Sequence, residues 1–99
     1  MYNKKYRLVE IESYMWQNPL HEQIKGRICY LAYLNEGERG WFLAETDDMF
    51  KPVHRIHTSK IRDIQHPTDN QIVVRTQNTK YVFELVMSEA DEEEVNVYE

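Results

Sequence analysis

The alternation of side chains between residues 80 and 87 constrains the fold more than any other feature of this sequence. Successive side chains of a β-strand point to opposite faces, so residues two apart lie on the same side. Every second position of this segment is apolar: Tyr81, Phe83, Leu85 and Met87. We therefore expect a strand on which these four side chains point into a hydrophobic interior.

Other apolar segments recur at roughly ten-residue intervals, a spacing typical of β-sandwiches and small barrels. Turn-forming residues separate them, as at 35–40 and 66–70. The expected strands cover 4–16, 27–34, 41–46, 53–57, 71–76 and 80–87. Five to six short strands predict an all-β fold, which is either a small antiparallel bent sheet or an SH3-like barrel, with at most one short helix.

Two segments have more than one interpretation. Residues 20–25 are ambiguous, and a single helical turn is one option. Residues 59–65 form either a helical turn capped by Thr58 and Ser59 or a bulged strand through 60–65. The segment 27–34 is apolar on both faces, so we expect it to be covered on both sides.

Charge is distributed unevenly along the 99 residues. The net charge is −5, yet residues 1–87 carry 12 basic and 11 acidic residues, which gives about +1. Residues 88–99 contain six acidic residues and no basic one. We expect one β domain over 1–87, because a chain of this length forms a single core. The segment 88–99 lacks hydrophobic periodicity and is predicted to be a disordered acidic tail.

Cys29 is the single cysteine of the chain and stands in an apolar run. We expect it to be buried as a small hydrophobic residue. A chain that cannot form an internal disulfide fits the reducing cytoplasm. No apolar run approaches the roughly 18 residues of a membrane span, so no membrane partner is expected.

Catalytic and metal-binding patterns fail on geometry. His54 and His57 are three apart on an expected strand, where they point to opposite faces and cannot share one metal ion. Ser59 lies near His57 in the sequence, but Thr58 and Ser59 have a simpler role as a cap or turn pair. No Gly-x-Ser-x-Gly elbow is present. We expect a protein that is not an enzyme and that uses no cofactor.

The uneven charge leads to the first functional hypothesis, a non-catalytic protein-binding module. Acidic residues of the tail would occupy a basic surface on another protein, and aromatic residues near the N-terminus would add contact area. The residues assigned to this role are Glu89, Asp91, Glu92, Glu93 and Glu94 of the tail, with Tyr14 and Trp16. A homodimer formed through exposed strand edges is a further expectation.

The alternative is a small barrel that binds single-stranded nucleic acid. Such barrels combine a basic groove with aromatic side chains on which bases stack. The residues assigned to this role are Arg55, Arg62, Arg75 and Trp41. Two observations weaken the alternative. The aromatic residues between positions 30 and 42 stand where a core is needed, and a body of nearly zero charge attracts phosphate only weakly.

The segments 33–42, 56–61 and 74–83 together resemble small uncharacterised β proteins of Firmicutes-type bacteria and their phages and plasmids. The marks of the resemblance are a Gly-rich hairpin before an aromatic residue, a Thr-Ser pair and an Asn-Thr hairpin. The resemblance implies an accessory protein of a phage or mobile element, such as an inhibitor of host defence of the anti-CRISPR kind. It implies no activity and no site residues.

Overall fold

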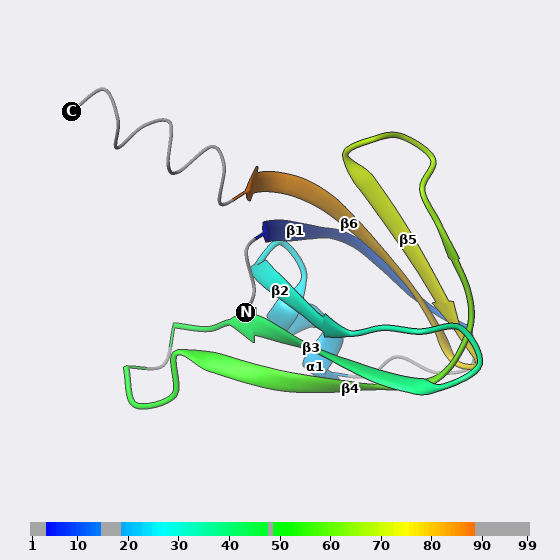
Figure 1. The fold of residues 1–99 in the computed structure, drawn as a ribbon. Helices are drawn as coiled ribbons and strands as arrows, with labels where there is room; N and C mark the ends of the chain where they lie inside the picture. The colour runs from blue at the N-terminus through cyan, green and yellow to red at the C-terminus, as the bar shows by residue number, and fades with distance from the viewer. Residues whose placement is uncertain (1–3, 15–18, 48, 89–99) are drawn as a thin grey trace, which may run out of the picture.

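The computed structural model describes residues 4–14, 19–47 and 49–88. Its elements are β1 (Lys4–Ser13), α1 (Pro19–Ile24), β2 (Ile28–Tyr33), β3 (Arg39–Glu45), β4 (Val53–Gln65), β5 (Gln71–Thr76) and β6 (Thr79–Ser88). The strands are antiparallel to their neighbours and close into a barrel in the order β1-β2-β3-β4-β5-β6 (Figure 1). The predicted all-β fold is confirmed, and of its two forms the structure has the barrel. Within the described ranges, no helix has the length and apolar character needed to cross a membrane.

The pairing of β1 with β6 closes the barrel. It extends from Lys4 opposite Ser88 to Ser13 opposite Thr79. Register shifts interrupt this ladder and those of β2–β3, β3–β4 and β4–β5. Each irregularity bends and twists its strand, which lets a sheet of six strands curl onto itself. Every described strand thereby gains two neighbours, and a homodimer through strand edges stays a prediction.

β4 resolves the ambiguity at residues 59–65, which are strand and not helix. The first part of β4 pairs with β3 and the last part with β5. The buried Thr58 hydroxyl accepts a hydrogen bond from the Gly40 amide at 2.9 Å and donates one to the Ser59 carbonyl at 2.8 Å. Thr58 therefore stabilises the irregularity between β3 and β4 and does not cap a helix.

The helical option at residues 20–25 is confirmed, because α1 lies there and connects β1 to β2. Ile24 is buried and anchors the helix to the core. Gly26 follows with a φ of 84°, a conformation that glycine adopts without a steric penalty. Its amide donates a hydrogen bond to the Leu8 carbonyl at 2.7 Å, which turns the chain into β2.

An aromatic cluster occupies the centre of the barrel. Phe42 of β3 and Phe83 of β6 are fully buried with ring centroids 5.2 Å apart, and Tyr81 lies 5.4 Å from Phe42. Both contacts are edge-to-face, a favoured geometry for aromatic pairs. The inward orientation predicted for Tyr81 and Phe83 is confirmed. Leu85 packs half-buried against the same core, and the side chain of Met87 lies outside the described residues.

The other aromatic residues of β2 and β3 correct the expectation that they would be needed for the core. Phe42 is buried, but Tyr33 is 45% exposed, and Tyr30 and Trp41 are half-buried. Tyr33 and Trp41 are register partners, although a shift intervenes between Leu31 and Tyr33. Because of that shift, strict alternation fails in β2 and Tyr33 shares the outer face with Tyr30.

Cys29 is fully buried, which confirms the prediction for this residue. Burial, with a smaller contribution from the nearby charge of Glu45, raises the pKa of its thiol from 9.0 to about 12. The thiol is therefore protonated at neutral pH, whereas a reactive cysteine needs a thiolate.

Candidate functional site

The outer face of β2, β3 and β4 gathers aromatic and basic side chains on one continuous surface. In β3 the alternate residues Phe42 and Ala44 are fully buried, so the positions between them point outward. The outward positions of β2 and β4 follow from their register with β3. We call this surface the hairpin face, and it consists of Tyr30, Tyr33, Arg39, Trp41, Leu43, Arg55, His57 and Lys60.

A row of three rings crosses the hairpin face. Tyr33 of β2 is the register partner of Trp41 of β3, which is in turn the partner of His57 of β4. Neighbouring strands are about 4.8 Å apart, so the three side chains stand next to one another. On one side of the row, Arg39 and Lys60 are also register partners and place two cations together. The row is therefore flanked by positive charge.

Arg55 supplies a cation on the other side of the row. Its guanidinium carbon lies 4.5 Å from the centroid of the Trp41 ring, a cation–π contact. The register partner of Arg55 is Leu43, so the contact with Trp41 is diagonal across the two strands. This contact fixes the orientation of both side chains before any ligand arrives.

Two carboxylates near the hairpin face accept hydrogen bonds from its tyrosines, and a third, Glu36, accepts one from the Ile64 amide at 2.8 Å. The Tyr33 hydroxyl donates to Glu38 at 2.7 Å, and this bond raises the pKa of Tyr33. The Tyr30 hydroxyl donates to Glu45, at the end of β3. Glu38 and Glu45 are thus each bound to a phenol group, and the centre of the face presents cations and rings.

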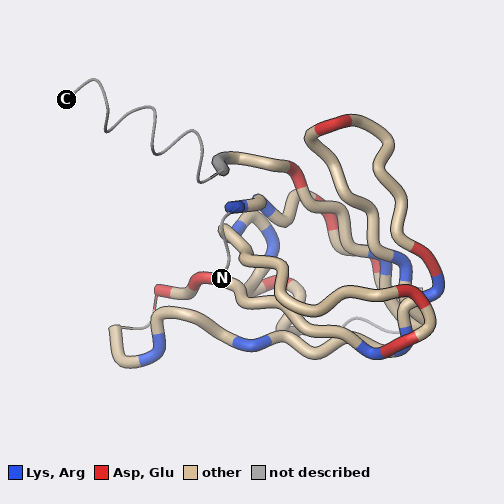
Figure 2. The backbone as a smooth tube through the Cα atoms, viewed as in Figure 1, with Lys and Arg blue, Asp and Glu red and all other residues tan. Residues whose placement is uncertain are grey.

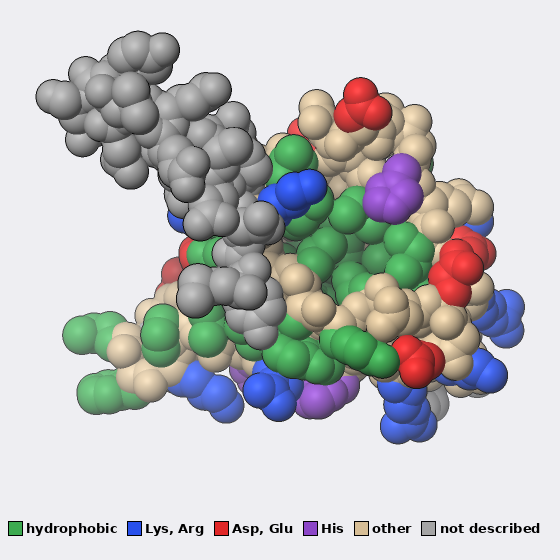
Figure 3. Space-filling model, in the orientation of Figure 1, with side chains coloured by type: hydrophobic (Ala, Val, Ile, Leu, Met, Phe, Trp, Pro, Cys, Tyr) green, Lys and Arg blue, Asp and Glu red, His purple; other side chains and the backbone are tan. Residues whose placement is uncertain are grey.

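The cations of the hairpin face are not neutralised within the described part of the chain. The ion pairs found there involve the other basic residues Arg27, Arg75 and Lys80. Figure 2 shows basic positions recurring along β4, and basic and histidine side chains line the rim of the molecule beneath that strand in Figure 3. This surface is consequently suited to a polyanion.

The four residues predicted to bind nucleic acid do not all lie together in the structure. Trp41 and Arg55 are in contact on the hairpin face. Arg62 is exposed at the register shift between β4 and β5, two residues beyond Lys60 with the buried Ile61 between them, so it lies at the edge of the hairpin face. Arg75 of β5 faces its partner Asp63, with 3.9 Å between their charged atoms. Arg75 therefore does not join the site.

Sequence reasoning committed to Trp41 and Arg55 and to none of the other six residues of the hairpin face: Tyr30, Tyr33, Arg39, Leu43, His57 and Lys60. Their types are ordinary for exposed strand positions, and they come from three different strands. Within β3, the period-two set that contains Trp41 also contains Arg39 and Leu43, which is a signal present in the sequence. The residues of β2 and β4 depend on register, which the sequence does not state.

Most residues predicted to bind a protein lie outside the described residues: Glu89, Asp91, Glu92, Glu93, Glu94 and Trp16. Tyr14 is described and is 47% exposed. Its amide donates a hydrogen bond to the Asn78 carbonyl at 2.9 Å, which places it beside the β5–β6 turn. The protein-binding role of this set stays a prediction.

The two histidines of β4 point to opposite sides, as their spacing predicts. His54 is half-buried on the same side as the buried Ile56, whereas His57 is exposed on the hairpin face. Among the described residues, no group of three or more His, Cys, Asp or Glu side chains is placed to hold a metal ion.

Ser13 and His21 form a hydroxyl–imidazole contact that sequence reasoning missed. The Ser13 hydroxyl lies 2.9 Å from Nδ1 of His21, and burial lowers the pKa of this histidine. The His21 ring also packs edge-on against Tyr81, with centroids 6.1 Å apart. Catalysis would further need a group that orients the histidine and donors for an oxyanion. We interpret the contact as a link between β1 and α1.

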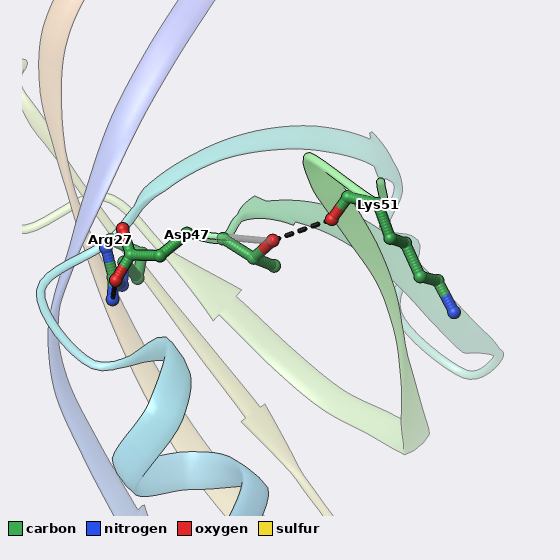
Figure 4. A network of polar contacts seen from close by, with 4 residues as sticks. Arg27, Asp47 and Lys51 are labelled. Atoms are coloured by element: carbon green, nitrogen blue, oxygen red, sulfur yellow. Dashed lines mark hydrogen bonds and ion pairs between the residues drawn. The ribbon is translucent and has the colours of Figure 1, made fainter. Parts of the chain in front are cut away.

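The base of the turn between β3 and β4 is tied to the start of β2. Arg27 binds Asp47 through two hydrogen bonds of 2.8 and 2.5 Å, and Figure 4 shows this pair with the neighbouring contact to Lys51. The ion pair holds the pKa of Asp47 below its ordinary value. A pocket of about 230 Å³ opens beside it, lined by Leu20, Gln23, Ile24, Arg27, Thr46, Asp47 and His54. It is smaller than typical ligand pockets, which begin at about 300 Å³, and its charged pair is already satisfied.

Comparison with models of known protein families, with curated proteins and with solved structures finds no match to this chain. The features that indicate what this chain binds are therefore those of the hairpin face itself.

Proposed function

We propose that this protein is a non-catalytic binding module that holds single-stranded nucleic acid on the hairpin face. The observation that carries the proposal is the row of Tyr33, Trp41 and His57 with cations on both sides. A single strand presents unpaired bases, which can stack on the rings of this surface. It also presents phosphates, which can pair with the cations on both sides of the rings.

The physical basis is the combination of stacking with counterion release. A base stacked on an aromatic side chain contributes about 1–3 kcal/mol, and each neutralised phosphate releases a counterion. Arg39, Arg55 and Lys60 can each reach a phosphate because the described structure pairs none of them with a carboxylate. Stacking accepts every base, so we expect little sequence preference.

The position of the aromatic residues removes one objection to this function. Tyr30, Tyr33 and Trp41 are not consumed by the core, since Phe42, Tyr81 and Phe83 fill it. The other objection, the weak charge of the whole body, matters less when three cations lie on one face. Binding should accordingly be salt-dependent.

The test is fluorescence anisotropy with a labelled oligonucleotide of about 15 nucleotides at low salt. We expect Trp41→Ala to weaken binding by about 1–3 kcal/mol, while Trp41→Phe keeps a ring and most of the affinity. The double variant Arg39→Ala/Lys60→Ala should reduce the slope of log K against log salt by about 1.4, because each phosphate contact contributes about 0.7. Removal of the exposed cations Lys4 and Lys25, which lie outside β2, β3 and β4, is the matched control.

The proposal is wrong if wild-type protein at about 100 μM leaves the anisotropy unchanged at low salt, since even non-specific binding is detectable there. It is also wrong if the control pair lowers the salt slope as much as the pair on the hairpin face. In that case overall charge and not this surface would determine binding.

The protein-binding hypothesis remains a second candidate because of the six acidic residues in 88–99 and the 47% exposure of Tyr14. It includes the inhibitor role implied by the resemblance to proteins of phages and mobile elements, and a cytoplasmic location. Pull-down with the full chain and with a chain lacking 89–99 tests it. A stoichiometric protein partner retained only by the full chain would favour it over nucleic acid.

A further inference from the structure

The turn between β3 and β4 exposes two large apolar side chains. Met49 is 90% exposed and Phe50 is 96% exposed. In Figure 3 the tip of this turn, at the far left, is covered by hydrophobic side chains. Isolated exposed apolar residues need no explanation, but these two are adjacent and stand at the end of the hairpin that carries the candidate site.

Contacts at its base hold this turn in place. The Thr46 amide donates a hydrogen bond to the Pro52 carbonyl at 2.9 Å, and the Thr46 hydroxyl donates one to the Lys51 carbonyl at 2.7 Å. The Arg27–Asp47 pair adds a charged tie to the barrel (Figure 4). Pro52 also restricts the backbone of Lys51. A turn whose two ends are fixed in advance loses less entropy when a ligand binds.

The tip is continuous with the hairpin face. Val53 is 38% exposed and lies on the same side of β4 as Arg55 and His57, with residues two apart throughout. Lys51 precedes it and brings a further cation between Phe50 and Arg55. From Phe50 to His57 is seven residues, about 23 Å of extended chain.

We infer that Phe50 is a second stacking platform, which binds an unpaired nucleobase of the same strand that the hairpin face holds. The inference rests on the proposed function and extends its site beyond the body of the barrel. The phosphates between the two platforms pass Lys51 and Arg55. An apolar pocket on a protein or an anionic lipid surface would also accept a phenylalanine beside a cation, but the cations here lead from the tip to the row of rings, which a strand of nucleic acid would occupy as well.

The experiment compares oligonucleotides of about 4 and 15 nucleotides, which bracket the site sizes of small barrels. The short one reaches the ring row alone, while the long one also reaches the tip. We expect Phe50→Ala to weaken binding of the long strand about 5- to 150-fold, the range for loss of one stacked base, and to leave the short strand unaffected. Phe50→Trp should restore the affinity. Val86→Ala, which removes an exposed apolar side chain of β6 outside both proposed platforms, is the control.

Each outcome decides between the two proposals. Loss of affinity in Trp41→Ala but not in Phe50→Ala, with the long strand, overturns the second platform and leaves the proposed function intact. An equal loss for both strand lengths also overturns it, because Phe50 would then belong to the first site. Failure of the wild type to bind either strand overturns both proposals. If Phe50→Ala abolishes co-sedimentation with phosphatidylserine vesicles and leaves oligonucleotide binding unchanged, the tip binds lipid and the inference is wrong.

Discussion

Thr76 has no exposed surface, and its hydroxyl group organises the turn between β5 and β6. The hydroxyl donates a hydrogen bond to the Thr79 carbonyl at 3.0 Å. It accepts hydrogen bonds from the amides of Thr79 at 3.0 Å and of Asn78 at 3.3 Å. A single buried oxygen thus satisfies the buried amide and carbonyl groups of Thr79 and also binds the amide of the exposed Asn78.

We predict that Thr76→Val destabilises the protein by about 1–3 kcal/mol, although it preserves shape and apolar contacts. The change leaves buried backbone groups without partners, and that penalty exceeds the gain from a second methyl group. Urea unfolding gives the free energy, with Thr76→Ser as the control that keeps the hydroxyl. Equal stability of the valine variant and the wild type would contradict this interpretation.

Cys29 gives a second prediction at this scale. Its thiol should react with Ellman's reagent at pH 8 only after unfolding, because burial raises its pKa from 9.0 to about 12. Above pH 9 the unfolded chain releases a proton that the folded chain keeps, so stability is present below 9.0 and is lost as the pH rises through about 12. Burial also raises the pKa values of Tyr6 and Tyr81, so these residues likewise lower stability as the pH rises.

The measurement is urea unfolding at pH 8 and pH 10.5 for the wild type and Cys29→Ala. Between these two pH values the wild type should lose more stability than Cys29→Ala, because only the wild type carries the thiol. Tyr6 and Tyr81 are present in both proteins, so their contributions cancel. A thiol that reacts equally fast in native and unfolded protein would show that the site opens to solvent.

At the scale of elements, two glycines shape the hairpin between β2 and β3 for different reasons. Gly37 has a φ of 87° and open space around it, so backbone conformation selects glycine there. Gly40 has an ordinary φ, but a Cβ atom would lie 2.3 Å from the Tyr33 carbonyl oxygen and 3.0 Å from a methyl of Ile61. The close approach of β2 and β3 therefore selects glycine at position 40.

We predict that Gly40→Ala destabilises the barrel by about 1–3 kcal/mol or more, because the clash is with backbone and forces the strands apart. Gly37→Asn is the matched variant, since asparagine tolerates the left-handed region and the site has room. Thermal unfolding of both variants gives the comparison. A smaller loss for Gly40→Ala than for Gly37→Asn would mean that β2 and β3 separate easily.

At the scale of the whole molecule, the charge of residues 89–99 opposes the binding proposed for the hairpin face. This segment holds all six acidic residues of the tail, so removing it from a chain of net charge −5 leaves about +1. Long-range repulsion of phosphate lowers association rates and affinity at low salt, and salt screens it.

We predict that a chain ending at Ser88 binds a 15-nucleotide strand more tightly than the full chain in about 20 mM salt, and equally well near 1 M, where the Debye length is about 3 Å. Anisotropy titrations at both salt concentrations measure the difference. The protein-binding hypothesis predicts the opposite response for its own partner, which the truncated chain should lose. Weaker oligonucleotide binding after truncation would show that the tail assists the site.

The sequence predicted a strand's orientation well where one set of alternate positions is apolar and the other is polar. In β6 one set of alternate positions, with Tyr81 and Phe83, is apolar and the other holds charges, so burial followed from the pattern. In β2 both sets are apolar, and the pattern did not say that Tyr33 would face outward. The hairpin face depends on that orientation, which explains why only Trp41 and Arg55 of the site were predicted.

By itself the sequence determined that this chain is an antiparallel β protein, where its strands lie and that Cys29 is buried, because strand periodicity and turn chemistry are local properties. Only the tertiary structure decided that the sheet closes, that β4 continues through 59–65 and that Tyr33, Trp41 and His57 stand in one row. The physical reason is register. A shift of one residue between two strands reverses which side chains face the core, and packing of the whole barrel selects the shift.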